Sequence, residues 1–125
     1  MTHKLVLFLL FISFYFVPFA QMKRSAYGIY KGKIDSYSIG KSDNVIQVDQ
    51  INIEIQILKG QIFIFIGNQK YEGTYSILLQ TKFYYLVEAK TDSKAPERLM
   101  VYKNERKILR EGISPQPNAI LVKMR

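Results

Sequence analysis

The side chains that could carry out chemistry in this chain are carboxylates, lysines, tyrosines and hydroxyls. The chain has no cysteine, and its one histidine is His3, inside an apolar N-terminal segment. Beyond residue 20, a Ser-His-Asp triad, a Cys-His pair and the usual zinc sites therefore lack the side chains that build them. We expect no catalytic residue, no metal site and no cofactor, and hence no enzyme.

Carboxylate-only chemistry, such as glycoside cleavage, remains open, and Glu54 and Glu72 are the pair that could perform it. The register expected from the hairpin turns places both on one face, on either side of an intervening strand. Two strand spacings of ~4.8 Å separate them by roughly 10 Å, at or beyond the range for inverting glycosidases and far beyond that for retaining ones. We therefore expect each to be a solvated residue that faces a Phe ring or a lysine.

Arg110 is the most specific candidate for ligand binding. If Asn104-Glu105 forms a turn, Leu99 faces Arg110, and Arg110 then shares the apolar face of its strand. An inward arginine in a small barrel is suited to clamping a carboxylate or a phosphate. In the alternative arrangement, Arg110 lies at a strand end and reaches solvent or pairs with a nearby carboxylate.

Tyrosine is unusually frequent, and Tyr71 and Tyr75 fall on the face expected to be the core. A buried tyrosine hydroxyl needs a hydrogen-bond partner, so inward tyrosines indicate a cavity or a rim more than a dry core. We therefore group Tyr71 and Tyr75 with Arg110 as ligand-binding candidates. The alternative is ordinary strand propensity, since tyrosine is favoured in β-strands.

The elements that must position these residues are β-strands throughout. Between residues 51 and 57, isoleucine alternates with polar residues, which is the period-two pattern of a half-buried strand. Turns at 59–60 and 67–68 link this segment to the next two strands, because Gly60 and Gly67 tolerate the positive φ of tight turns. The other strands are expected at about 26–38, 44–48, 61–66, 69–80, 82–90, 98–103, 106–112 and 119–124.

The turns define a register that sorts the side chains into two faces. Ile55 faces Ile64, and Ile64 in turn faces Tyr71 on the core side. The other face carries Phe63 and Phe65 among polar residues, which makes these two rings candidates for an interaction surface. They form either an exposed aromatic patch for a partner or part of a second buried layer beneath another strand or loop.

The strand pattern predicts a single all-β domain over residues 21–125. Its simplest architecture is an antiparallel meander of about eight strands that forms a small barrel or a two-sheet sandwich. In outline this resembles the small barrels of lipocalins and fatty-acid-binding proteins. The Gly-x-Trp of the lipocalin first strand cannot occur in a chain without Trp, and no segment looks like the lid helices of the fatty-acid binders. We infer membership of neither family.

Residues 1–20 have the three-part pattern of a secretory signal peptide. A short cationic start precedes a 13-residue apolar run at 5–17, and Ala20 supplies a small residue at the end. The run is shorter than the ~20 apolar residues that span a bilayer, although an uncleaved anchor is the alternative. We expect export to the periplasm or the extracellular space, with no stable membrane span after cleavage.

Residues 21–125 carry 17 basic and 10 acidic side chains, a net charge of +7, and the basic excess is strongest in residues 98–125. A basic surface favours acidic partners, but it is also typical of an ordinary solvated face. We do not expect nucleic acid as a partner, because the chain has no compact run of Lys and Arg of the kind that binds it.

These observations predict an exported small β-barrel binding module that holds an apolar or amphipathic ligand inside, with Arg110 and inward tyrosines as polar contacts. The alternative is a protein-interaction or structural module that presents an aromatic or basic patch to a protein or an anionic surface. The state of the barrel interior distinguishes these two functions. A filled interior opposes the first function, and a pocket lined by Arg110 supports it.

Overall fold

The computed structural model describes residues 21–125 except residues 42 and 94, so the expected signal peptide lies outside the described residues. The described part begins with a short 3-10 turn, η1 (Arg24–Ala26), and continues as β-strands. The strands are β1 (Gly28–Ile34), β2 (Tyr37–Ile39), β3 (Ile46–Val48), β4 (Ile51–Leu58), β5 (Gln61–Ile66), β6 (Gln69–Gln80), β7 (Tyr84–Thr91), β8 (Glu97–Tyr102), β9 (Lys107–Glu111) and β10 (Ala119–Lys123).

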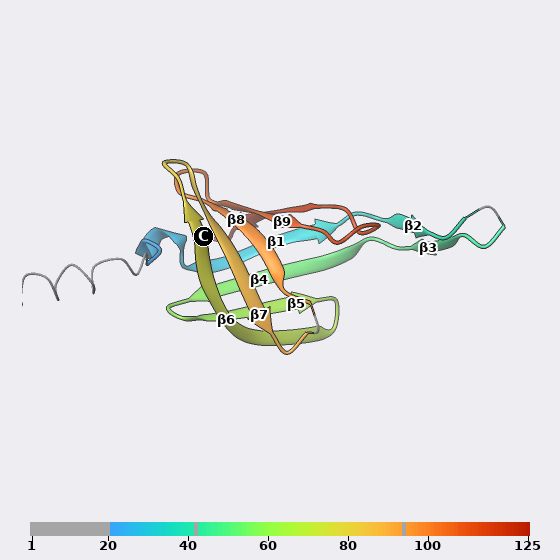
Figure 1. The fold of residues 1–125 in the computed structure, drawn as a ribbon, viewed down its shortest axis with the longest axis horizontal. Coiled ribbons are helices and arrows are strands. Elements are labelled where there is room, and N and C mark those ends of the chain that lie inside the picture. Colours follow the sequence, from blue (N-terminus) through green and yellow to red (C-terminus); the bar gives the residue numbers. More distant parts are fainter. Residues whose placement is uncertain (1–20, 42, 94) are drawn as a thin grey trace, which may run out of the picture.

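Eight of these strands form a closed antiparallel barrel (Figure 1), which confirms the predicted fold class and selects the barrel over the sandwich. The order around the ring is β1-β10-β9-β8-β7-β6-β5-β4. The barrel is therefore a meander from β4 to β10, and β1 closes it by pairing with both β4 and β10. Closure gives every barrel strand two partners, which removes the free edges that invite aggregation.

The predicted registers are confirmed at all three hairpins tested. Ile55 faces Ile64, and Ile64 faces Tyr71, while Leu99 faces Arg110. The turns that set the first register do have positive φ, +73° at Gly60 and +58° at Gly67. Because the side-chain period of a strand is two residues, a correct register also assigns each side chain to the correct face.

The barrel interior is filled with apolar side chains. Among the described residues, seven of the 17 apolar ones that are buried are isoleucines, whose β-branched side chains pack well at the inward positions of strands. Met22 and Ala26, from the segment around η1, join the same core at one end of the barrel. Two tyrosines fix this end, since Tyr30 donates a hydrogen bond to the carbonyl of Ala26 (2.7 Å) and Tyr85 accepts one from the backbone of Lys23 (3.2 Å).

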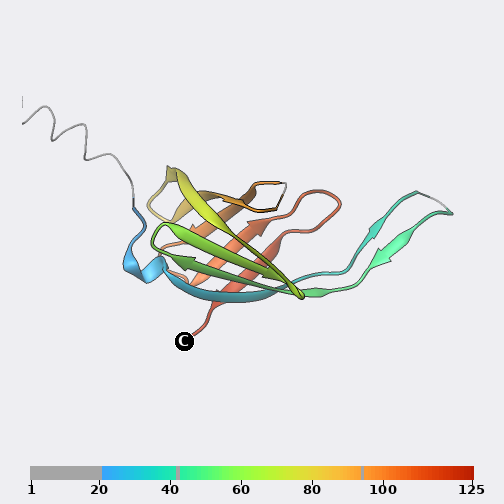
Figure 2. The same cartoon turned by 90° about the horizontal axis from the view of Figure 1, so that it is seen from below.

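The strands β2 and β3 form a separate two-stranded ribbon that projects from the barrel (Figures 1 and 2). Ile34 pairs with Ile51 in the barrel, and Tyr37 pairs with Val48 in the ribbon. Both pairs belong to one unbroken register, so the ribbon is the outer part of the β1–β4 hairpin. We call residues 35–50 the arm.

Gly73 allows two barrel strands to approach closely. A Cβ atom at this position would lie 1.9 Å from the backbone oxygen of Lys90 on the neighbouring strand. The clash is with backbone, which cannot rotate away as a flexible side chain can.

Replacing Gly73 with Ala should therefore force β6 and β7 apart and lower the free energy of unfolding by about 1–3 kcal/mol, the usual range for overpacking. Urea unfolding followed by circular dichroism measures this loss. Thr74→Ala, at the exposed neighbouring position, is the matched control and should stay within about 0.5 kcal/mol of the wild type. Equal stability of the two variants would contradict the close approach.

Tyr30 supplies a pH-dependent part of the stability. Burial raises the pKa of its hydroxyl to about 12, and the nearby positive charge of Arg106 opposes this rise in part. The folded state thus favours the neutral phenol, whereas the unfolded state ionises near pH ~10. The stabilisation is complete below that pH and is lost as the pH rises towards about 12.

Tyr30→Phe should accordingly flatten the fall in unfolding free energy above pH ~10, because Phe has no proton to lose. Urea unfolding curves collected at several alkaline pH values compare the two proteins. A fall as steep in Tyr30→Phe as in the wild type would assign the pH dependence to other groups.

Candidate functional site

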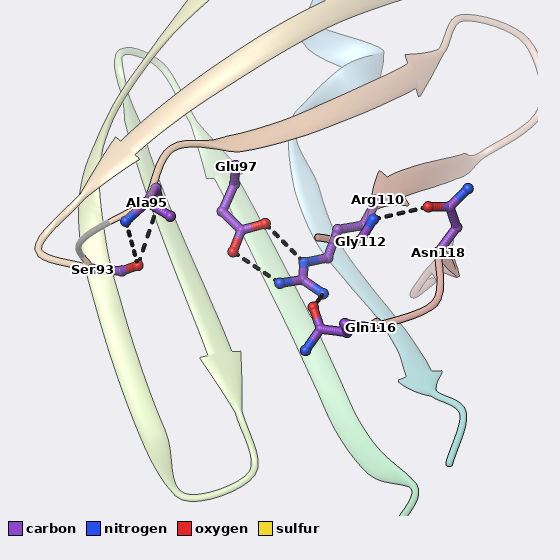
Figure 3. Close-up of polar contacts among 7 residues, drawn as sticks. All are labelled: Ser93, Ala95, Glu97, Arg110, Gly112, Gln116 and Asn118. Atoms are coloured by element: carbon purple, nitrogen blue, oxygen red, sulfur yellow. Dashed lines mark hydrogen bonds and ion pairs between the residues drawn. The ribbon is translucent and has the colours of Figure 1, made fainter. Parts of the chain in front are cut away.

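Arg110 lies inside the barrel in a buried ion pair with Glu97 (Figure 3). The arginine side chain is only 4% exposed. Its Nε and Nη2 atoms each donate to one oxygen of the Glu97 carboxylate at 2.9 Å, and Nη1 donates to Oε1 of Gln116 at 2.6 Å. This two-pronged geometry is the strongest form of an arginine–carboxylate contact.

The inward position of Arg110 agrees with the predicted register, and its carboxylate partner matches the alternative arrangement given for it. Glu97 takes the paired donors that a ligand carboxylate would otherwise use. Among the described residues, no buried side-chain nitrogen or oxygen lacks a hydrogen-bond partner. No described polar side chain inside the barrel is therefore left unpaired for a ligand.

Glu97 and Gln116 were not among the sequence candidates. For Glu97 a signal existed, because it stands two residues before Leu99 on β8 and must point to the same inner face. Gln116 belongs to the loop between β9 and β10, which is further held by a hydrogen bond from the Gly112 backbone to the Asn118 side chain (2.9 Å; Figure 3). No strand pattern specifies the path of such a loop.

Tyr71 and Tyr75 are half-buried and pack against the core, but their hydroxyl groups do not join the Arg110 cluster. The Tyr75 hydroxyl donates to the carbonyl of Leu58 (2.7 Å) and accepts from the backbone of Gly60 (3.3 Å). Burial raises the pKa of Tyr75, and the hydrogen bond from Gly60 opposes this. The Tyr71 hydroxyl donates to the side chain of Gln69. Both hydroxyl groups thus have partners within the protein.

Phe63 and Phe65 lie on the outer face of β5 and are half-buried. The ammonium group of Lys70, on the neighbouring strand, lies 5.0 Å from the centre of the Phe63 ring and 5.9 Å from that of Phe65. These distances allow cation–π attraction, which places a charged side chain over part of each ring. The two rings therefore face outward from the barrel wall.

A groove of about 530 Å³ lies beside Phe65 on the outer face of β1, β4 and β5, close to where the arm leaves the barrel. Phe65 supplies an apolar wall, while Lys31 and Lys33 supply positive charge and Asn52 an amide. Lys31 pairs with Glu54 across 3.6 Å. Lys33 makes no ion pair with any residue that the structure describes.

Glu54 and Glu72 lie on opposite sides of β5, as the register predicted, and they face Phe65 and Phe63. Glu54 is held by its ion pair with Lys31 and by a hydrogen bond from Gln56 (2.7 Å). This arrangement keeps the two carboxylates two strand spacings apart. That spacing exceeds what a retaining glycosidase requires.

In the described part of the chain, no three His, Cys, Asp or Glu side chains gather where they could hold a metal ion. The same residues include no helix with the length and apolar character needed to cross a membrane. No protein-family model matches the chain, and no curated protein or solved structure is significantly similar to it. The functional argument therefore depends on the geometry of the site.

Replacing Arg110 with Met should lower the free energy of unfolding by about 3–5 kcal/mol, because it leaves the Glu97 carboxylate buried without a partner. The double variant Glu97→Leu/Arg110→Leu removes both charges and should recover most of this loss, since apolar pairs often replace buried ion pairs at little net cost. Urea unfolding measures both. A double variant as unstable as Arg110→Met would show that the pair itself is not the origin of the loss.

Proposed function

We propose that the protein is an exported binding module that recognises an anionic, amphipathic target at the groove beside Phe65. The observation that carries this proposal is the contrast between the two faces of the barrel. Inside, the described polar groups are paired and the apolar side chains are packed. Outside, the Phe65 ring, two lysines and the Glu54 carboxylate, which pairs with one of those lysines, line a groove.

An interior ligand, the first function expected from the sequence, has little support. Inward side chains from several strands, including Ile57, Val87 and Leu99, are completely buried against one another. Protein interiors pack as densely as organic crystals, so a ligand in this space would have to displace core side chains. Arg110 would also have to exchange Glu97 for the ligand.

The chemistry of the groove favours an amphipathic anion. Its volume of about 530 Å³ falls within the range of small-molecule sites. The Phe65 ring offers apolar contact, and Lys33 offers an ammonium group that makes no ion pair with a described residue, while the Glu54 carboxylate of the groove is paired with Lys31. The net charge of +7 on residues 21–125 adds a long-range attraction for anions.

The N-terminal segment supports the exported part of the proposal. The cationic start, the apolar run of 5–17 and Ala20 form the pattern that secretion machinery recognises. Export would place the groove in the periplasm or the extracellular space. The absence of cysteine suits such a site, because no thiol is exposed to oxidation there.

Titration with 8-anilinonaphthalene-1-sulfonate tests the groove, because this probe joins aromatic rings to a sulfonate and fluoresces in apolar surroundings. Lys33→Gln should weaken its binding about tenfold, the usual effect of losing a charge-assisted contact. Phe65→Ala should weaken it similarly. Phe83→Ala, which removes a 66% exposed ring on another surface, is the matched control and should leave the affinity unchanged.

The double variant Glu97→Leu/Arg110→Leu separates the two possible locations of the probe. Because it alters only the interior ion pair, groove binding should persist in it at wild-type affinity. Loss of binding in this double variant, together with unchanged binding in Lys33→Gln, would contradict the proposal and return the site to the barrel interior.

A further inference from the structure

The positive charge of the barrel is concentrated at one of its two ends. This end holds η1, the C-terminus and the turns that join β4 to β5, β6 to β7 and β8 to β9, and it lies opposite the arm (Figures 1 and 2). It contains nine basic side chains and one acidic side chain, a net charge of +8. We call it the basic end, and its residues are 21–27, 58–60, 80–84, 102–107 and 123–125.

The opposite end is acidic. It holds the arm and the connections at 67–68, 91–97 and 111–118, which together contain six acidic and two basic side chains, a net charge of −4. The net charge of +7 on residues 21–125 is thus distributed unevenly along the barrel axis. A negatively charged surface therefore attracts one end of the barrel and repels the other.

Hydrogen bonds join the segments of the basic end into one surface. The backbone of Lys103 donates to the carbonyl of Phe83 (2.9 Å), and the backbone of Lys123 donates to the carbonyl of Arg106 (2.9 Å). The ammonium group of Lys123 also donates to the carbonyl of Ser25 (2.6 Å). The β6–β7 turn, the β8–β9 turn, the end of β10 and η1 are therefore neighbours in space.

Few of these charges are neutralised within the described chain. Glu105 forms an ion pair with Lys107 (2.7 Å), and the other eight basic side chains of this end make no ion pair with any described residue. Two of them, Lys59 and Lys82, are exposed at turns. Another, Lys103, lies 4.7 Å from the centre of the Tyr85 ring, a contact that leaves its charge in place.

Exposed apolar side chains lie among these charges. Phe83 is 66% exposed at the β6–β7 turn, Leu58 47% beside the β4–β5 turn, and Met124 48% after β10. The turn at Phe83 is well ordered, because the hydroxyl of Thr81 accepts hydrogen bonds from the backbones of Phe83 and Tyr84, both at 3.1 Å. A ring presented by an ordered turn loses little conformational freedom when a partner buries it.

An anionic lipid bilayer accommodates both the charges and the apolar side chains. Its head groups attract lysine and arginine, and the acyl chains beneath them accept apolar groups. Phe83, Leu58 and Met124 come from three separate segments, and a fluid bilayer receives them without matching pockets. An acidic polysaccharide offers the charge alone and would leave all three side chains in water.

The N-terminal segment is attached at the same end. Residue 21 belongs to the basic end, so the apolar run of 5–17 joins the barrel there. In the export proposed above, this run enters the membrane before it is cleaved. The basic end would then be the part of the barrel nearest to the bilayer.

We propose that the protein docks on the surface of an anionic lipid bilayer through its basic end. Phe83, Leu58 and Met124 enter the interface, and the surrounding lysines and arginines contact lipid phosphates. The arm then extends away from the bilayer. The groove beside Phe65 lies where the arm leaves the barrel, so this inference does not depend on the ligand proposed for the groove.

Residues 21–125 contain the whole described barrel and its core, so they can be tested without the apolar run of 5–17. Co-sedimentation should show them bound to vesicles of phosphatidylcholine with about 30% phosphatidylglycerol, and bound at least about tenfold more weakly to pure phosphatidylcholine. Raising NaCl from about 0.05 M to about 0.5 M should weaken the binding by screening the charges.

Lys59→Gln/Lys82→Gln should weaken binding to the anionic vesicles about twentyfold, since each lysine at a membrane surface contributes about fivefold. Lys33→Gln/Lys90→Gln removes the same charge near the opposite end of the barrel and is the matched control. Its binding should stay within about twofold of the wild type, because charges farther than a Debye length from the membrane are screened.

The chain has no tryptophan, so a single introduced one reports only its own surroundings. The emission of Phe83→Trp should shift to shorter wavelength when anionic vesicles are added, and brominated phosphatidylcholine in those vesicles should quench it. Ile46→Trp, at a 65% exposed position on the arm, is the matched control and should show neither change.

Three results would overturn the proposal. The first is no binding to the anionic vesicles, including the case in which the protein binds heparin instead. The second is a loss of binding in Lys33→Gln/Lys90→Gln as large as in Lys59→Gln/Lys82→Gln, or larger, which would place the lipid at the groove. The third is vesicle binding with no change in the emission of Phe83→Trp.

Discussion

Closure of the barrel between β1 and β10 is the constraint on which the rest of the structure depends. Until that seam forms, the period-two pattern of each strand distinguishes two faces but does not say which of them is enclosed. Closure makes one face an interior. Gly32 is part of this seam, since a Cβ atom there would lie 2.4 Å from the backbone oxygen of Ile120. The ring closes where the smallest residue allows the two strands to touch.

The enclosed face then decides where binding can occur. Eight strands give an interior just wide enough for side chains to fill it, and isoleucine-rich strands do fill it here. Among the described residues, the buried ion pair is that of Arg110 with Glu97, and Gln116 accepts the remaining hydrogen bond of the arginine. A barrel of this size therefore acts as a scaffold. Its charged and aromatic side chains lie mostly on the outer face of the strands and on the arm.

The strands and their registers followed from the sequence because local rules specify them. Gly60 and Gly67 mark two-residue turns, and each turn fixes the pairing of the strands that it joins. The contact between Arg110 and Gln116 could not be predicted from the sequence, because Gln116 belongs to a loop whose path no strand pattern specifies. The side chain of Tyr75 packs against the core, on the face that the register predicted, but its hydrogen bonds with Leu58 and Gly60 depend on the path of the β4–β5 turn. The groove beside Phe65 is lined by residues from three strands, and alternation along one strand does not encode how their side chains meet.

The unbroken register between the β1–β4 pair and the arm has a consequence for the evolution of this protein. A hairpin can grow or shrink by equal numbers of residues in its two strands without moving any pair below the change. The barrel would keep its seam, its core and its groove through such events. Arm length is thus a trait that can vary independently of the fold that supports it.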